Sequence, residues 1–384
     1  MQTGGDILGE GTYGCVFHPP IKCDGEKRRR SGVGKVVRKL FDANEEMKIG
    51  KLLAKIDPKG IFTNPLTSTC IIKKKNITKT DQNNLICGIT STLNENTSYK
   101  QLIYKYKGVD LSLTEKGDIR KMYNLIEGLK TLQTNKLCHR DIKEENILDL
   151  GKKYVYIDFG LSCKLDEVYR MDDENILMHN YIYYPPEFKM YAIMQTLLTK
   201  FDYTNDKESL VDDVFDELQE LSFVNTYQSI KSDLKSLGVY KTIRGDVYNA
   251  IHKVVHDTVD MSVVNRKKYF TKLAKYADVF SLGVVILRES LKEMNDSYSS
   301  IDSKQQQKLE AIIKRAIHFD VFQRCSAEEL LVSFKEFLGM KKIPQNCTKH
   351  FSLTTLKALA KKYNMKTSGT KQELYDRLSK NLKI

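Results

Sequence analysis

Two short blocks in the middle of the chain combine acidic, basic and amide side chains at fixed spacing. The first block, His-Arg-Asp-Ile-Lys-Glu-Glu-Asn, contains Asp141, Lys143 and Asn146. The second, Asp-Phe-Gly, begins with Asp158 and follows a run typical of a β-strand. One carboxylate can orient the proton of an attacking hydroxyl, while a second carboxylate and an amide can hold metal ions that neutralise phosphates. These residue types indicate transfer of a phosphoryl group from ATP.

A glycine-rich stretch near the start of the chain fits the same chemistry. Gly9, Gly11 and Gly14 form the pattern Gly-x-Gly-x-x-Gly, and Val16 follows two residues later. Glycines let backbone amides approach phosphate oxygens without a side-chain clash. Dinucleotide-binding folds share the pattern, but there a helix follows the glycines. Here a Pro-Pro pair follows soon after, so we expect a strand–loop–strand hairpin.

These segments together resemble those of eukaryotic-type protein kinases. The resemblance covers residues 5–337 apart from one long insert, and it implies an α+β fold with two lobes. Under it, Asp141 is the catalytic base and Lys143 neutralises the transferring phosphate. Asn146 and Asp158 are the expected Mg²⁺ ligands. The lysine after the base favours Ser and Thr hydroxyls of protein substrates.

The resemblance also implies an ATP site built from both lobes. A lysine on the third strand pairs with a helix glutamate in such kinases, and we expect Lys35 and Glu46 to form this pair. Lys39 and Glu45 remain the alternative. The other candidate ATP-binding residues come from the glycine loop, the hinge and the strand after the catalytic loop: Gly9, Glu10, Gly11, Thr12, Tyr13, Gly14, Val16, Tyr104, Lys105, Tyr106, Lys107, Asp110 and Leu148.

Further residues are expected to brace the C-terminal lobe. By the same resemblance, Glu187 pairs with Arg324, and Asp278 caps the backbone of the catalytic loop. Glu187 and Asp278 are 91 positions apart, far more than the family usually has. An insert at about 190–272 is therefore expected, and its periodic leucines predict a helical subdomain that either binds a partner or is a passive elaboration. Asn180 replaces a threonine that normally bridges the base and the lysine.

The end of the chain has a different pattern. After an expected linker at 338–350, periodic leucines predict two helices joined by a turn in residues 351–384. The run Leu-x-x-Leu, then Ser-Gly-x-Lys-x-Glu-Leu-x-x-x-Leu, resembles the SAP module, a small helix-turn-helix unit that binds DNA. A net charge of +6 over 351–384 is typical of phosphate-directed binding. The candidate nucleic-acid-binding residues are Lys357, Lys361, Lys366, Ser368, Gly369 and Lys371. A small hairpin that binds a protein partner is the alternative.

Composition sets the class of protein. The 384 residues are 41% hydrophobic and 29% charged, a composition typical of soluble globular proteins. No apolar run is long enough to span a membrane, and no secretory leader is recognised, so we expect a cytoplasmic rather than a secreted protein. The eight cysteines include no Cys-x-x-Cys pair and are expected to be reduced thiols. The net charge of +13 indicates polyanionic partners.

The sequence thus predicts a kinase N-lobe at 1–105, a C-lobe at 106–337 and a SAP-like module at 351–384. The start Gly-Cys-Val-Phe-x-Pro-Pro resembles protein kinases of giant DNA viruses, which implies a host cytoplasm or a virion. We expect an active Ser/Thr kinase that uses ATP and Mg²⁺ and is held on DNA by its tail. The competing hypothesis is a pseudokinase scaffold that recruits partners to nucleic acid.

Overall fold

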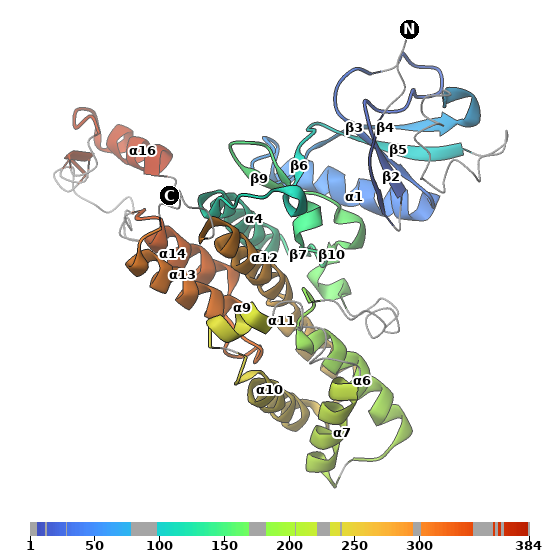
Figure 1. The fold of residues 1–384 in the computed structure, drawn as a ribbon, viewed down its shortest axis with the longest axis vertical. Helices are drawn as coiled ribbons and strands as arrows, with labels where there is room; N and C mark the ends of the chain where they lie inside the picture. Colours follow the sequence, from blue (N-terminus) through green and yellow to red (C-terminus); the bar gives the residue numbers. More distant parts are fainter. Residues whose placement is uncertain are drawn as a thin grey trace. The chain divides into compact units, whose positions relative to one another are not determined.

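The computed structural model contains two compact units, Met1–Leu331 and Val332–Ile384. The first unit combines strands and helices, in agreement with the expected α+β kinase fold, and the second is helical in its described part (Figure 1). The residues that the structure describes are 6–11, 14–27, 29–77, 98–168, 182–203, 205–220, 231–238, 240–294, 301–340, 356–357, 360–361 and 365–382.

A five-stranded antiparallel sheet begins the first unit, with the strand order β1-β2-β3-β5-β4. Helix α1 (Leu40–Ile56) packs against it through Ala43, which contacts Val37 and Leu102. β1 and β2 form the hairpin expected around the glycines. The strands are β1 (Asp6–Gly11), β2 (Gly14–His18), β3 (Val33–Val37), β4 (Leu66–Lys73) and β5 (Ser98–Tyr104).

Two cysteines of this sheet region form a disulfide. Cys23 follows β2 and is bonded to Cys70 on β4, 47 positions later. Cys15 is also disulfide-bonded. The expectation of eight reduced thiols is therefore wrong for these three residues. Spacing alone could not predict the pair, because the packing of the sheet brings the two cysteines together. Cys138, Cys163 and Cys325 are free thiols.

The second lobe places the two chemical blocks on short strands over a helical core. The long buried helix α12 (Ala277–Met294) packs against α4 (Met122–Thr134). The remaining elements are β6 (Val109–Asp110), β7 (Leu137–Cys138), β8 (Ile147–Asp149), β9 (Tyr154–Tyr156), β10 (Cys163–Lys164), α13 (Ser303–Ala316), α14 (Ala327–Phe337), and the single 3₁₀ turns η1 (Lys74–Asn76), η2 (Leu111–Leu113), η3 (Ile119–Lys121), η4 (Glu144–Asn146), η5 (Phe159–Leu161) and η6 (Leu165–Glu167).

β6, β8 and β9 form a three-stranded sheet, and β7 pairs with β10. The catalytic loop therefore runs from β7 to β8, and the Asp-Phe-Gly block runs from β9 to β10. Because β7 and β10 pair, the start of the catalytic loop lies beside the segment that follows the Asp-Phe-Gly block. Cys138 lies directly opposite Cys163 in this pairing.

The predicted insert is helical in its described part. It contains α6 (Pro186–Lys200), α7 (Lys207–Glu220), α9 (Lys231–Ser236), α10 (Ile243–Thr258) and α11 (Val263–Ala274). α7 packs against both α6 and α10. The periodic residues Leu210, Val214, Leu218, Leu234 and Leu237 are buried, as their spacing predicted, while Leu221 and Ile230 lie outside the described residues.

The second unit has its own small apolar core. Leu356 and Ala360 pack against Leu374 and Leu378 of α16 (Lys371–Leu382). The helix begins with a reciprocal cap: the Glu373 carboxylate accepts from the backbone amide of Thr370, and the Thr370 hydroxyl accepts from the amide of Glu373. Across both units, none of the helices in the described ranges is long and apolar enough to cross a membrane.

Candidate active site

Lys35 connects the two lobes. Its ammonium lies 2.9 Å from Glu46 on α1 and 2.6 Å from Asp158 in the Asp-Phe-Gly block. Burial alone lowers the pKa of Lys35, but the carboxylates of Glu46 and Asp158 outweigh burial and raise the pKa above its usual value. Burial likewise raises the pKa of Asp158, whereas the Lys35 ammonium lowers it, and the net shift is downward. Both groups are therefore charged at neutral pH.

The alternative lysine has a different position. Lys39 is exposed and forms the N-cap position of α1, without a capping hydrogen bond from its side chain. Glu45 pairs with the neighbouring Lys48 on the helix surface. Lys35 is buried on β3, where it lies between Val16 of β2 and Leu102 of β5. Of the two pairs left open by the sequence, the structure brings together Lys35 and Glu46.

Tyr104 and the hinge segment after it lie next to the Lys35–Glu46 pair along the chain of contacts. The Tyr104 hydroxyl donates to Glu46 at 2.6 Å, a contact that the sequence did not predict. Burial and the Glu46 carboxylate raise the pKa of Tyr104 well above its usual value, so the hydroxyl stays a donor. In the hinge, the Asn64 side chain accepts from the Tyr106 amide at 2.9 Å and donates to its carbonyl at 3.0 Å. The hinge backbone is thereby fixed between the lobes.

The catalytic loop gathers three of the predicted residues around one carboxylate. Asn146 donates from Nδ2 to the Asp141 carboxylate at 2.7 Å and to its backbone carbonyl at 2.8 Å. The Lys143 ammonium lies 3.2 Å from the same carboxylate oxygen, Oδ2. Because both Asn146 bonds use Nδ2, the oxygen Oδ1 is the atom that this side chain offers to a cation. The Asp141 side chain is 15% exposed and thus reachable from outside.

Asp278 holds the backbone of the catalytic loop from beneath. Its two carboxylate oxygens accept from the amides of His139 at 2.7 Å and Arg140 at 2.9 Å. This confirms the capping role expected of Asp278. Arg140 has φ +68° and Asp158 has φ +56°, in the left-handed region that non-glycine residues rarely adopt. Such conformations persist where surrounding contacts enforce them, as Asp278 and Lys35 do here.

His139 is fully buried between the two blocks. Its Nε2–H donates to the Ile157 carbonyl at 3.1 Å, and its Nδ1 accepts from the Asp141 amide at 3.3 Å. Its ring contacts Phe159 at a centroid distance of 4.5 Å. Burial lowers the pKa of His139, which keeps the ring neutral. The neutral ring connects the strand before Asp158 to the amide of Asp141.

Comparison with protein families agrees with this geometry. A family model described as a protein kinase domain matches residues 3–196, which is half of the chain. The chain belongs to the protein kinase family. A second model, described as a SAP domain, matches residues 348–383, so the kinase carries a SAP domain at its C-terminus. A comparison with curated proteins finds no match.

The kinase-domain match ends within α6, yet helices after it complete the C-lobe. Arg324 pairs with Glu187 at 2.5 and 3.1 Å, and both side chains are buried. This confirms the predicted bracing pair. Asp278 also lies beyond the matched residues. The helices after the insert therefore support a catalytic loop that lies before it.

A cluster around Glu144 was missed by sequence reasoning. Arg288 donates to Glu144 at 2.6 Å, and Lys292 lies 3.1 Å from the same carboxylate. The Tyr183 hydroxyl also donates to Glu144 at 3.1 Å. The cluster ties the segment before α6 to the catalytic loop of the kinase. In the sequence, the only sign of this cluster is that Arg288 and Lys292 are four residues apart and so share one face of a helix. This spacing does not indicate that Glu144 is their partner.

Other predicted residues of the kinase lie around this centre. A Cβ added to Gly14 would meet the Val36 carbonyl at 2.1 Å, so the close approach of β2 and β3 requires glycine here. A Cβ at Gly9 would meet no atom within 4 Å, so this position on β1 faces open space. Asp110 accepts from Ser112 and caps a short turn. Gly11 ends β1, whereas the side chain of Glu10 and all of Thr12, Tyr13 and Asn180 lie outside the described residues.

The SAP domain exposes its candidate contacts around the turn before α16. Gly369 has φ +126°, and Arg377 donates to the carbonyls of Lys366 and Ser368 at 2.5 and 2.9 Å, which orders this turn. The side chains that the sequence proposed for nucleic acid are exposed: Lys357, Lys361, Lys366, Ser368 and Lys371.

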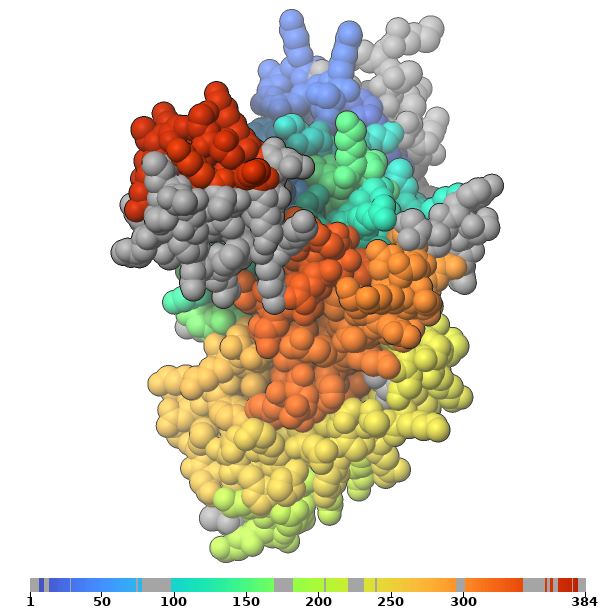
Figure 2. All heavy atoms as spheres, turned by 90° about the vertical axis from the view of Figure 1, so that its left-hand side faces the viewer, coloured from blue at the N-terminus to red at the C-terminus, as the bar shows by residue number. Residues whose placement is uncertain are grey.

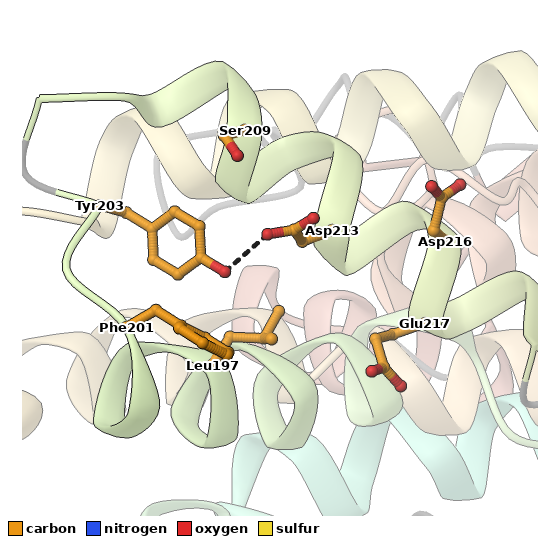
Figure 3. A pocket seen from close by; sticks show the side chains of 7 residues that line it. All are labelled: Leu197, Phe201, Tyr203, Ser209, Asp213, Asp216 and Glu217. Carbon is orange, nitrogen blue, oxygen red and sulfur yellow. Dashed lines mark hydrogen bonds between the residues drawn. The ribbon is translucent and has the colours of Figure 1, made fainter.

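A separate pocket lies in the insert of the kinase. It has a volume of about 470 Å³ and lies between α6 and α7. Figure 3 shows Leu197 and Phe201 on one side and the α7 carboxylates on the other, with the Tyr203 hydroxyl donating to Asp213 at 2.6 Å. None of the candidate catalytic residues lines it.

Proposed function

We propose that the chain is an ATP-dependent protein serine/threonine kinase that its SAP domain holds on DNA. The observation that carries the catalytic part is the Lys35 ammonium, which bonds Glu46 and Asp158 at once. Kinases need the strand lysine, the helix glutamate and the Asp-Phe-Gly carboxylate in place together before they transfer phosphate. Here the ammonium lies within ion-pair distance of both carboxylates.

The residues fit ATP and Mg²⁺ by the chemistry of their donors. Mg²⁺ prefers carboxylate and carbonyl oxygens, and Asp158 and Asn146 Oδ1 offer these two types. Open space above Gly9 lets backbone amides approach phosphate oxygens. Lys35 would hold the α- and β-phosphates, and the hinge backbone at Lys105–Lys107 would hold adenine. Bound Mg²⁺ would supply neutralisation of the phosphate charge.

Asp141 and Lys143 would carry the proton and the charge. Two donors, Asn146 and Lys143, engage Oδ2 of Asp141, so Oδ1 would be the oxygen that accepts from a substrate hydroxyl. Asp141 would accept the hydroxyl proton, and Lys143 would stabilise charge on the phosphoryl group in transfer. A lysine two residues after the base supports Ser and Thr as acceptors.

The test uses the purified full-length chain with labelled ATP and a mixture of Ser-, Thr- and Tyr-containing peptides. We expect label on Ser and Thr, and loss of label in Asp158→Ala. The matched control is Asp166→Ala, which removes an exposed carboxylate from the same segment and retains activity. Equal labelling by the wild type and Asp158→Ala would overturn the enzymatic proposal and favour the pseudokinase scaffold, and label on Tyr alone would overturn the Ser/Thr assignment.

DNA tethering has its own test. The exposed lysines of the SAP domain support phosphate contacts, and each contact that is lost reduces the salt dependence of binding by about 0.9 in log–log slope. The full chain should leave duplex DNA at higher salt than a chain without residues 345–384. Lys371→Ala should lower the slope by about 0.9, the value for one phosphate contact, while Lys48→Ala, at an exposed position of α1, should leave the slope unchanged. Unchanged retention after truncation would refute the tether.

A further inference from the structure

The insert carries a cluster of metal-ligating side chains away from the kinase site. Glu208 lies in the first turn of α7, and His252 and His256 lie on α10. One potential ligand atom from each residue lies within 4.8 Å of the other two. Within the described part of the chain, no other group of three His, Cys, Asp or Glu residues comes this close together.

The fold of α10 turns both histidines to the same side. Ile251 and Val255 are buried, so the helix packs through that face. His252 and His256 are four residues apart and therefore adjacent on the exposed face. Their rings stack with centroids 4.2 Å apart and an interplanar angle of 24°. Packing of α7 against α10 then brings Glu208 to the two rings.

The distances suit one small cation. The Nε2 atom of His256 lies 2.9 Å from Oε1 of Glu208, and the Nε2 atom of His252 lies 3.5 Å from the same oxygen. Ligand atoms around a tetrahedral ion with bonds of about 2.0–2.1 Å are roughly 3.3 Å apart. The two observed separations bracket this value, and one nitrogen of each imidazole lies within 4.8 Å of the other, so side-chain rotation can bring the three atoms to bonding distance of one ion.

We propose that Glu208, His252 and His256 bind one Zn²⁺ ion. Two imidazole nitrogens and one carboxylate oxygen form a donor set that Zn²⁺ takes where a fourth position is open to water. The three side chains are 62%, 47% and 38% exposed, which leaves that position open to solvent. The ion would join α7 to α10 and so stabilise the insert.

The neighbouring cations leave the site accessible to a metal ion. Lys207 precedes Glu208 but pairs with Asp260 at 2.6 Å. Lys253 lies next to His252 but pairs with Asp257 at 3.2 Å. Figure 2 shows the residues of α7, α10 and α11, from yellow-green to light orange, gathered on one part of the surface.

A metal-free arrangement is the competing explanation for this cluster. In it, the Glu208 carboxylate forms hydrogen bonds with the two imidazoles and binds no ion.

The experiment titrates Zn²⁺ into the full-length chain, prepared without a histidine tag and stripped with a chelator. We expect one Zn²⁺ per chain and a higher Tm when the ion is bound. His252→Ala, His256→Ala and Glu208→Gln should each weaken Zn²⁺ affinity at least about tenfold, since even indirect partners of a metal contribute this much. Bound Co²⁺ should give the visible absorption of a tetrahedral site in the wild type alone.

The control removes a neighbouring contact and leaves the three ligands in place. Asp260→Asn breaks the pair with Lys207 and should keep the wild-type Zn²⁺ affinity. Mg²⁺ should produce no Tm shift that depends on His252 or His256, because imidazole is a poor ligand for it. Zn²⁺ binding that survives in all three ligand variants, or the absence of saturable binding in the wild type, would overturn the proposal.

Discussion

The Lys35 ammonium lies 2.6 Å from the Asp158 carboxylate, although the two residues are 123 positions apart along the chain. Because the same ammonium also bonds Glu46, one buried cation serves a helix of the first lobe and the Asp-Phe-Gly block of the second. Replacement of Lys35 would leave two carboxylates close together without their cation. Both catalysis and the association of the lobes should respond to this site.

Lys35→Met should lower the rate of phosphoryl transfer by about 10²–10³-fold, as is typical when one preorganised electrostatic contact is lost. The side chain is of similar length, so the change removes the charge rather than the packing. Lys39→Met is the matched control, since Lys39 is exposed at the start of α1. Comparable losses in the two variants, measured with labelled ATP, would contradict the assignment of Lys35.

Acid should weaken the fold through His139. Burial lowers its pKa in the folded state, so the unfolded chain binds the proton first as the pH falls below about 6.5. The contribution of the neutral His139 ring to the free energy of unfolding is complete above that pH. Below it, this contribution falls by at most about 1.4 kcal/mol per pH unit. Urea unfolding between pH 7.5 and 5.5 should show a shallower decline for His139→Phe. Identical declines would contradict the prediction.

Arg324→Ala should destabilise the kinase unit by about 3–5 kcal/mol, because it leaves the buried Glu187 carboxylate without its partner. The matched control is Arg315→Ala, which breaks a surface pair with Glu329 whose side chains are half exposed. That change should cost less than about 1 kcal/mol. Chemical denaturation of both variants measures the difference, and equal losses would show that burial of the pair does not matter.

The Cys23–Cys70 disulfide closes a loop with a sequence separation of 47. Loop-closure entropy predicts that Cys23→Ser with Cys70→Ser lowers the free energy of unfolding by about 4 kcal/mol under oxidising conditions. Alkylation of the denatured, unreduced wild type should leave both cysteines unlabelled by mass spectrometry, while Cys138 and Cys325 are labelled. Labelling of Cys23 and Cys70 would show that the bond is absent.

The sequence predicted the residues that belong to local catalytic motifs. The catalytic loop, the Asp-Phe-Gly block and Lys35 are local patterns in which residue type and spacing carry the chemistry. The bracing contacts of Asp278 and Glu187 were also predicted, because the resemblance assigns each a partner. The periodic leucines of the insert predicted buried helical faces for the same local reason.

Contacts that depend on three-dimensional packing could not be predicted. Glu144 meets Arg288 only because α12 passes beneath the catalytic loop, 144 positions later. Tyr104 was expected at the adenine pocket, but its bond to Glu46 depends on where α1 lies against the sheet. The same holds for the Cys23–Cys70 bond and for the contact of Glu208 with the histidines of α10. Both depend on how distant elements pack, and local sequence patterns do not specify this packing.

The Asp278 cap has a consequence for the synthesis of the chain. The Arg140 amide depends on a carboxylate that lies 138 residues further along. At about 5–20 residues per second, a ribosome adds those residues in roughly 7–28 s. During that interval the catalytic loop has emerged without its anchor, and the whole helical insert is made before the anchor arrives. The order of translation therefore delays a competent active site until the insert and Asp278 have been made.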